Sequence, residues 1–444
     1  MKRLVTLMLA VLLAFTLVGC SGGGSEGGGS EAADGKTTIT FWTQDTVSWV
    51  SYFDGAIERF ETDNPDINIE VEYFSSFADK VNQAFNANTM PDVVFTWQAI
   101  SDFANAGKLR EVPDTVYSAS DWNTLFYPGA IANKALNGKY YGVPDEINVE
   151  SPSLYVNMDK LAELGVELPA GWIENNGPAT WQELIDFAKP LTVKDSSGNV
   201  TFAGLSYAYA QWEAMFESLI WQYGGEFRDE ANYTVHFQTE EAKKALEFML
   251  QYLGTGADAV CAGNTDRYDD FAQGLAAMCI GAPWYAGGFD YDMEGTNYQV
   301  FNVPPFVAGA KPVCLATGGW SYVVTTNCSD DKADAAWTFV KYLTSAKEDG
   351  TWAITTGAIP SRTDALSDLT YDANKGSVEK AIAITMDVLP YAEEDGAYML
   401  TPSTLTYTII REALYQLLMD GDIDACLATI QANAETMLAE NASH

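Results

Sequence analysis

The sequence predicts an α/β fold arranged as two domains or lobes. Residues 37–95 follow the order strand, helix, strand, helix, strand, which is the pattern of a parallel sheet with helical crossovers. Strand-like and helix-like segments continue to alternate up to the C-terminus. The chain has 444 residues, which is long for a single domain. Together these observations favour two α/β units.

The N-terminus has the features of an export signal. Lys2 and Arg3 precede an apolar run at 4–17, which is too short to span a membrane comfortably. Leu17-Val18-Gly19-Cys20 then resembles the bacterial lipobox, in which the cysteine becomes the lipidated N-terminus. Acyl chains on one residue anchor a protein by burying CH2 groups in the bilayer. The alternative is a plain secreted protein in which Cys20 has no such role.

A glycine-serine tract follows this motif and has the composition of a flexible tether. We therefore expect residues 1–19 to be a lipoprotein signal peptide and residues 20–36 to be a lipid-anchored tether. The folded part would then work on the outer face of the cell membrane, with the lipid anchor as its only membrane contact.

The first elements are predicted from hydrophobic periodicity. Strands are expected at 37–42, 67–74 and 91–95, and helices at 49–61 and 77–88. Ligand crevices in parallel sheets lie beyond the carboxyl ends of the strands. Gln44 and Asp45 follow the first strand, and Trp97 and Gln98 follow the third, so we expect these four side chains on one rim.

Later elements continue the α/β pattern. Extended pieces are expected over 138–157, and Thr180 with Glu183 forms a capping-box pattern that opens a helix ending near Pro190. A strand is expected at 201–207, and a helix at 211–223 stops at Gly224-Gly225. Further helices are expected at 239–252, 333–343, 405–419 and 423–439.

Composition restricts the ligand. The formal net charge of −37 repels phosphate backbones, so nucleic acid is excluded as a partner and a neutral or cationic ligand fits better than an anion. The 12 Trp residues supply broad apolar faces with one N–H donor each, which suit ring-shaped ligands. Most of these rings are nevertheless expected in the core, where aromatic side chains usually pack.

The sequence predicts no metal or cofactor. It has six Cys residues without CxxC spacing and two His residues, which argues against a zinc site or a Cys-His nucleophile. The glycine-rich stretches lack the Lys-Ser/Thr of a phosphate-binding loop. Disulfide loops Cys261–Cys279 and Cys314–Cys328 are conceivable, but sequence alone does not settle the pairing.

Short segments across the whole chain resemble those of one family. They include NGKYYGVPDE (137–146), SLYVNMDKLAELGVELP (153–169), FAQGLAAMCIGAPW (271–284) and GGWSYVV (318–324). Others lie at 39–42, 60–73, 88–95, 106–114, 180–191, 335–345 and 355–362. Their order and spacing resemble the sugar-binding proteins of ABC importers, a family that includes maltose-binding protein and whose Gram-positive members are tethered lipoproteins.

The resemblance implies a two-lobed, periplasmic-binding-protein-like fold, in which each lobe is a mostly parallel sheet flanked by helices. The lobes would comprise 37–148 with 301–348, and 149–300 with 349–444. Crossing strands would lie near 147–151, 300–304 and 344–352 and would act as the hinge for closure around the ligand. The implied protein is a monomer that binds a carbohydrate, presents it to the membrane subunits of an ABC permease, and catalyses no reaction.

The resemblance and sugar chemistry together select the candidate ligand-binding residues. Sugars need aromatic faces for their rings, and carboxylates or amides for their hydroxyls. Besides the rim residues, Glu150 holds the position where the maltose-binding relative has an acidic cleft residue, and Trp284 matches the stacking Trp of the family. The remaining candidates are Trp212, Glu213, Gly319, Trp320 and Tyr407.

Other functions stay open from sequence alone. A receptor for a polyol or polyamine is the nearest alternative, because an acidic surface tolerates a cationic ligand. A tethered glycoside hydrolase is less favoured, because no spacing singles out a catalytic carboxylate pair among the many Asp and Glu residues. An adhesive surface protein would lack a closing cleft. Asp420-Gly421-Asp422 resembles the start of a calcium loop, but the sixth and twelfth loop positions are Ala425 and Gln431, which favours a turn.

Overall fold

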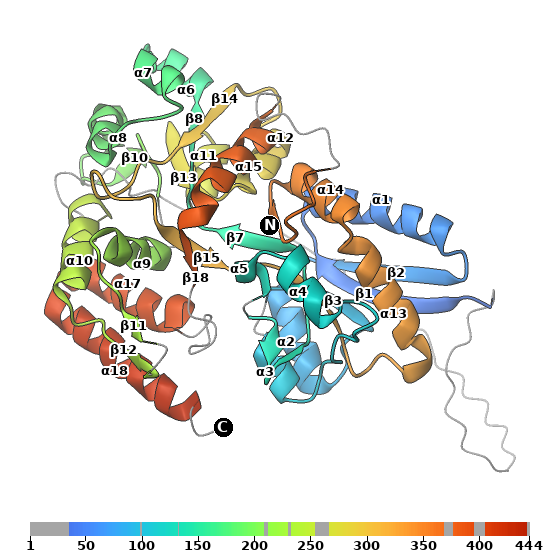
Figure 1. Cartoon of the computed structure of the whole chain (residues 1–444). Coiled ribbons are helices and arrows are strands. Elements are labelled where there is room, and N and C mark those ends of the chain that lie inside the picture. The colour runs from blue at the N-terminus through green and yellow to red at the C-terminus, as the bar shows by residue number, and fades with distance from the viewer. Residues whose placement is uncertain are drawn as a thin grey trace, which may run out of the picture.

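The computed structural model describes residues 35–97, 100–131, 133–207, 212–229, 232–253, 266–367, 376–394 and 405–441. The predicted signal peptide, most of the tether, Cys20 and Gln98 lie outside these residues. Figure 1 shows two lobes side by side, with a small sheet between them. The predicted two-lobed α/β fold is therefore confirmed.

The first lobe contains a five-stranded sheet in the order β2-β1-β3-β16-β6. Its strands are β1 (Thr37–Gln44), β2 (Ile67–Phe74), β3 (Val93–Thr96), β16 (Ser321–Val324) and β6 (Val143–Pro144). Strand β1 runs parallel to β2 and β3, as the sequence predicts. Strands β3 and β16 are antiparallel, because β16 carries the chain back from the other lobe. The sheet is therefore mixed rather than mostly parallel.

Helices cover this sheet and bury an aromatic core. They are α1 (Val47–Asp63), α2 (Phe77–Ala87), α3 (Ile100–Asn105), α4 (Ala119–Leu125), α13 (Asp330–Leu343) and α14 (Ala346–Thr356). Phe41, Phe53 and Phe95 have no exposed surface, and the Phe41 and Phe53 rings meet edge to face at 5.1 Å. Short elements α5 (Pro128–Ile131), β4 (Ala135–Leu136) and β5 (Lys139–Tyr140) complete the lobe.

The second lobe contains a three-stranded antiparallel sheet. Strand β8 (Ser153–Asn157) lies between β13 (Met278–Gly281) and β14 (Tyr298–Asn302). The expected strand at 201–207 is divided in two. Its start, β10 (Val200–Phe202), pairs with β9 (Val193–Lys194), while Ala203 and Ser206 form parallel bridges to Ala276 and Cys279. The "mostly parallel" description thus does not extend to this lobe, since strands entering and leaving it run in opposite directions.

Further helices accompany α9 (Trp212–Gln222) in the second lobe. They are α6 (Met158–Glu163), α7 (Ala170–Glu174), α8 (Trp181–Ala188), α10 (Glu240–Leu253), α11 (Arg267–Ala272), α12 (Tyr285–Asp292), α15 (Ser377–Val388), α17 (Arg411–Asp420) and α18 (Ile423–Asn441). Residues Trp212–Trp221 of α9 are all buried, so this helix is buried on every face. Minor elements are β11 (Arg228–Asp229), β12 (Thr234–Val235), the 3-10 turns Lys189–Leu191 and Leu389–Tyr391, and η3 (Leu405–Ile410), a π-helix.

The predicted capping box opens α8. The Thr180 hydroxyl accepts a hydrogen bond from the Glu183 amide at 3.1 Å. The Glu183 carboxylate in turn accepts bonds from the Ala179 amide at 2.9 Å and from Trp172 Nε1 at 2.6 Å. Glu183 therefore caps the start of α8 and also accepts the indole N–H of the buried Trp172.

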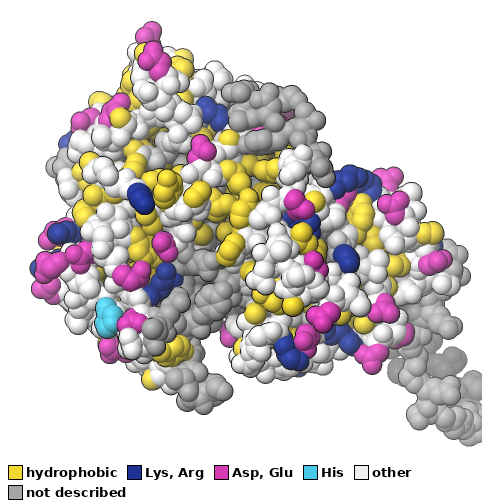
Figure 2. Space-filling view, in the orientation of Figure 1, with side chains coloured by type: hydrophobic (Ala, Val, Ile, Leu, Met, Phe, Trp, Pro, Cys, Tyr) yellow, Lys and Arg dark blue, Asp and Glu magenta, His cyan; other side chains and the backbone are white. Residues whose placement is uncertain are grey.

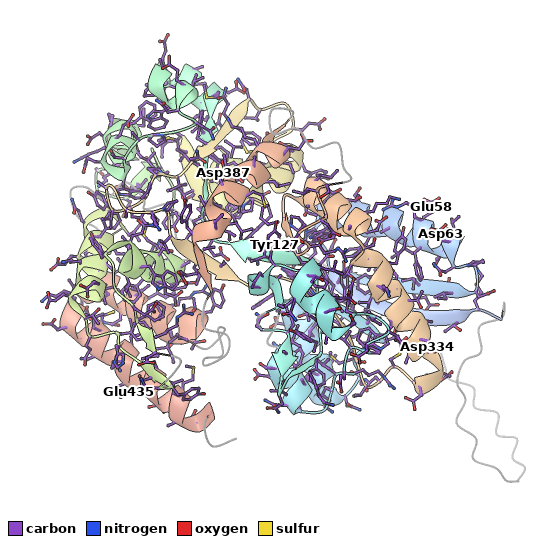
Figure 3. All side chains as sticks on the ribbon, in the orientation of Figure 1. Glu58, Asp63, Tyr127, Asp334, Asp387 and Glu435 are labelled. Atoms are coloured by element: carbon purple, nitrogen blue, oxygen red, sulfur yellow. The ribbon has the colours of Figure 1, made fainter. Side chains whose placement is uncertain are left out.

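A four-stranded sheet, β17-β7-β15-β18, lies between the lobes (Figure 1). Its members are β17 (Ile359–Pro360), β7 (Glu146–Val149), β15 (Cys314–Thr317) and β18 (Ala392–Glu394). Figure 3 labels Tyr127 at this junction, where its amide donates to the Ser361 carbonyl at 2.9 Å. In Figure 2, hydrophobic side chains gather along the junction, whereas Asp and Glu are spread over both lobes.

Two glycines let the lobes touch. A Cβ atom on Gly287 of α12 would lie 2.6 Å from the Thr356 carbonyl oxygen, and one on Gly357 would lie 2.6 Å from that of Pro283. Helix α14, which carries Trp352 into the first-lobe core, thus meets α12 of the second lobe backbone to backbone.

Cys279, Cys314, Cys328 and Cys426 are free thiols. The conceivable loops Cys261–Cys279 and Cys314–Cys328 are therefore absent, although Cys261 itself lies outside the described residues. None of the helices in the described ranges has the length and apolar character needed to cross a bilayer.

Candidate functional site

The first-lobe rim is formed where β1 and β3 end. Strand β1 pairs in parallel with both neighbours, so Gln44, Asp45 and Trp97 follow strands that end at the same edge. The Gln44 amide donates to the Thr46 hydroxyl at 3.1 Å, and Asp45 is exposed. The Trp97 side chain is 42% exposed, which is unusual for a ring of this size. An aromatic face and a carboxylate are thus both available on this edge.

An open surface pocket adjoins Asp45. It lies where β2 ends and α2 begins, and its lining is polar: Asp45, Tyr73, Phe74, Ser75, Ser76, Asp79, Lys80 and Gln83. The Asp45 amide donates to the Phe74 carbonyl at 3.1 Å, which fixes the two strand ends together. Sequence reasoning missed this group, although the rule that selected Gln44 and Asp45 applies equally to the residues after the second strand.

Trp320 lies in the first-lobe core rather than on the rim. Its ring is 8% exposed and meets the rings of Trp49 at 4.6 Å and Phe95 at 5.2 Å. The preceding Gly319 has φ of +59°, and a Cβ there would lie 2.4 Å from the Glu146 carbonyl oxygen. Gly319 therefore accommodates the neighbouring strand β7, whereas the sequence predicted a close approach of ligand.

Glu150 lies directly after β7, at the junction of the lobes. It is 4% exposed, and its amide donates to the Leu315 carbonyl at 3.0 Å. Together with Ser151 and Tyr207 it lines a narrow pocket whose other walls are mostly apolar. Burial and the Glu150 charge raise the pKa of the nearby Cys314 thiol to about 12. The acidic residue predicted from the resemblance is therefore inside the protein at the crossing strands.

Trp212, Glu213 and Tyr407 come together in the second lobe. Trp212 is 7% exposed, and its Nε1 donates to the Tyr207 carbonyl at 2.6 Å. Glu213 has no exposed surface and forms an ion pair with Arg411. The Arg411 guanidinium lies 5.1 Å from the Tyr407 ring centre. Glu213 and Arg411 are 198 positions apart in sequence, and Arg411 joins Glu213 to Tyr407.

Arg411 was missed from the sequence. Its side chain is 34% exposed, so part of the guanidinium remains accessible while Glu213 neutralises its charge. A signal was present, because Tyr407 and Arg411 are four positions apart and share a face once the segment is helical.

Trp284 is half-buried at the start of α12. Its neighbour Tyr285 accepts a hydrogen bond from Arg267 Nε at 3.0 Å. Burial raises the pKa of Tyr285 to about 12, although Arg267 opposes this, so the hydroxyl is neutral at physiological pH. Trp284 therefore sits on a well-fixed turn at the edge of the second lobe.

The described residues offer hydrogen-bonding and stacking groups rather than a metal centre. Within the described ranges, no group of three or more His, Cys, Asp or Glu side chains is placed to hold a metal ion. The buried carboxyls Asp145 and Asp349 line neither of the two pockets described above.

Comparison with known proteins identifies the family. The sequence model of the bacterial extracellular solute-binding proteins matches residues 44–349. A maltotriose-binding protein of Pyrococcus abyssi is 24% identical over 342 residues, which cover 75% of this chain and 68% of that protein. The sn-glycerol-3-phosphate-binding periplasmic protein UgpB of Escherichia coli K12 is 23% identical over 361 residues, covering 78% and 80%.

A solved structure shows the same fold. The GacH receptor of Streptomyces glaucescens, whose structures include a complex with acarbose, superposes with a TM-score of 0.71. The superposition covers 91% of this chain and 99% of the receptor at 24% sequence identity. The two-lobed architecture with strands passing between the lobes is therefore that of periplasmic binding proteins.

Proposed function

The chain belongs to the bacterial extracellular solute-binding protein family, and on this premise we propose that it captures an uncharged oligosaccharide between its lobes and delivers it to an ABC permease. The relatives include proteins named for maltotriose and for sn-glycerol 3-phosphate, so the chemistry of this chain has to decide between a sugar and a phosphate.

The observation that carries the choice is the pairing of Arg411 with Glu213. A site built for a phosphate needs an uncompensated cation. Here the buried Glu213 carboxylate neutralises the guanidinium that lies over Tyr407. A net charge of −37 further disfavours an anion. Exposed Trp97 and half-buried Trp284 offer the ring faces that a sugar requires.

The proposed binding residues come from both lobes and from the junction. Trp320 and Gly319 would support the site without touching the ligand, because Trp320 packs in the first-lobe core and Gly319 leaves room for the Glu146 backbone of β7. Arg411 joins the residues expected from the sequence, which are Gln44, Asp45, Trp97, Gln98, Glu150, Trp212, Glu213, Trp284 and Tyr407.

We also propose that residues 37–148 with 301–348 form one moving lobe and that 149–300 with 349–444 form the other. Helix α14 is the exception, since Trp352 packs into the first-lobe core. Strands β7 and β15 would flex during closure. The protein would act as a monomer without chemistry, held by a lipid on Cys20 at the outer face of a Gram-positive membrane.

A thermal-shift screen of residues 36–444, which contain every described strand and helix, tests this function. The panel is maltotriose, mannobiose, mannotriose, a polyol, a polyamine and glycerol 3-phosphate. A ligand that binds only the folded state raises the melting temperature by mass action. We expect a shift with a neutral glycan, and its loss in Trp284→Ala. Tyr291→Ala is the matched control, because Tyr291 lies on the same helix and is 61% exposed.

Shifts with the polyamine alone would redirect the function to a cationic solute. A shift with glycerol 3-phosphate alone would contradict the argument from Arg411 and Glu213. Release of a smaller sugar from the bound glycan would contradict the absence of chemistry.

A further inference from the structure

Arg267 is a cation with no exposed surface, at the start of α11. Burying an unpaired charge is costly, so such a side chain persists only where its surroundings compensate it. Its Nε donates to the Tyr285 hydroxyl at 3.0 Å, and its NH1 group donates to the Ser151 hydroxyl at 3.1 Å. The guanidinium also lies 5.1 Å from the Tyr207 ring centre and 5.4 Å from that of Tyr285.

These contacts join three separate parts of the chain. Ser151 follows the junction strand, Tyr207 precedes α9, and Tyr285 opens α12. The Ser151 hydroxyl also accepts a bond from the Tyr207 hydroxyl at 2.9 Å. Ser151 has a positive φ of 57°, which a non-glycine residue adopts only when its surroundings hold it there.

Each of the three contacts adjoins a proposed ligand-binding residue. Ser151 is next to Glu150, Tyr285 is next to Trp284, and the Tyr207 carbonyl accepts the Nε1 hydrogen bond of Trp212 at 2.6 Å. One buried side chain therefore fixes the backbone beside Glu150, Trp284 and Trp212 at the same time.

The guanidinium is charged in this setting. Burial acts to lower the pKa of Arg267, but the Tyr285 and Tyr207 hydroxyls and the Glu150 carboxylate outweigh it, and the pKa stays above its ordinary value. A lysine could not replace this geometry, because an ammonium lacks the planar fork that reaches two acceptors and stacks on two rings.

We propose that Arg267 is a positioning residue for ligand recognition: without touching the ligand, it holds Glu150, Trp212 and Trp284 in the arrangement that binds it. The inference deepens the proposed function and rests on it. The competing explanation is that Arg267 only stabilises the fold. The two differ in one respect, since a purely structural residue changes stability without changing the affinity of the folded protein.

The test is a double-mutant cycle on Arg267→Lys and Tyr285→Phe, with affinity for maltotriose measured by calorimetry and unliganded stability by melting temperature. If maltotriose gives no shift, the cycle uses whichever panel glycan does. Tyr285→Phe removes one hydroxyl and leaves the ring, so the protein should still fold, and its melting temperature shows how much stability the lost acceptor of Arg267 Nε contributes. We expect each single variant to weaken binding by about tenfold, equal to about 1.4 kcal/mol. The double variant should bind the glycan no more weakly than Arg267→Lys alone, because both changes break the same contact between Arg267 and Tyr285.

Tyr298→Phe is the matched control. Its hydroxyl donates to Asp290 and lies 3.2 Å from the Ala286 carbonyl oxygen, so it also fixes α12 but lies outside the Arg267 network. It should change the melting temperature without changing affinity. An unchanged affinity in Tyr285→Phe, or additive effects in the cycle, would overturn the positioning role.

A measurement without ligand separates this inference from the proposed function. Amide hydrogen exchange of the segments 150–152 and 284–286 should accelerate together in Arg267→Lys, whereas Tyr298→Phe, which contacts only Ala286 of these residues, should leave exchange of 150–152 unchanged. If the wild-type protein binds no glycan, the proposed function fails, and exchange alone then decides whether Arg267 holds these segments. Unchanged exchange in both segments of Arg267→Lys would refute the positioning role of Arg267.

Discussion

Asp145 and Asp349 are fully buried at the junction of the lobes, and each leaves its Oδ1 atom without a hydrogen-bond partner. Their Oδ2 atoms are satisfied. Asp145 accepts from the Tyr322 hydroxyl at 3.2 Å, and Asp349 accepts from the Arg362 amide at 2.9 Å. The nearby Arg362 guanidinium forms its ion pair with Asp364 and forms none with Asp145 or Asp349. Asp145 and Asp349 repel each other when both are ionised, so a proton on either carboxyl relieves that repulsion.

Burial and mutual repulsion raise the pKa of Asp145, which Glu146 and Glu348 also face, and burial raises the pKa of Asp349. The native state thus holds a proton more tightly than the unfolded chain, so the free energy of unfolding falls as pH rises above about 4, the ordinary Asp pKa.

Asp349→Asn should therefore stabilise the protein at neutral pH. The Asn oxygen can keep the bonds to Ser361 and Arg362, while the neutral amide removes the buried charge that repels Asp145. We expect the variant to be more stable than the wild-type protein at pH 8, and we expect this gain to vanish near pH 4. Urea unfolding at several pH values measures it. Asp334→Asn on α13, where the exposed acid is labelled in Figure 3, is the control, and an equal gain there would show that the gain does not come from the buried pair.

Trp97→Ala and Trp320→Phe should separate ligand binding from stability. Trp97 is 42% exposed, so its loss should weaken glycan binding by about tenfold with a stability change within about 0.5 kcal/mol. Trp320 is packed among core rings, so its truncation should cost about 1–3 kcal/mol. Calorimetry and urea unfolding check the pair. Equal stability losses would show that Trp97 is packed in the core.

Gly319→Ala should be far more destabilising than Gly309→Ala. Both glycines have positive φ, so both substitutions incur the same backbone strain of about 1 kcal/mol. A Cβ at Gly309 meets no atom within 4 Å, whereas one at Gly319 meets the Glu146 carbonyl oxygen at 2.4 Å. The difference in unfolding free energy isolates the cost of that close approach. Similar losses would mean that β7 moves aside.

The thiols should be unreactive while the protein is folded. Burial raises the pKa of Cys328 and Cys426 to about 12 and places that of Cys279 well above the ordinary value. The thiolate is the reactive form, so maleimide labelling at pH 8 should be negligible at these positions and complete in denaturant. Peptide mass spectrometry identifies the labelled sites. Fast native labelling of Cys279 would contradict its burial.

The sequence predicted local structure better than it predicted the site. Hydrophobic periodicity and turn-forming residues predicted the first three parallel strands, and Thr180 with Glu183 predicted the start of α8. These signals act within a few residues of the chain. The rim at Asp45 followed from the rule for parallel strands.

Long-range packing was not predictable in the same way. Trp97 and Trp320 look equivalent in sequence, and only the three-dimensional fold places one on the surface and the other beside Trp49. The pairing of Glu213 with Arg411 joins residues 198 positions apart, and no local pattern encodes it.

The backbone contact between Gly287 and Gly357 has a mechanical consequence. Because α12 and α14 already touch there, the lobes cannot approach further at that point and can separate only by breaking the contact. The contact would serve as a fulcrum: a rotation of a few degrees about it would leave these backbones nearly still and displace each rim in proportion to its distance from it. Spin labels beside Gly287 and Gly357 would then report an almost constant separation on ligand binding. Labels at the first-lobe rim and at the facing edge of the second lobe would report a much larger change in distance.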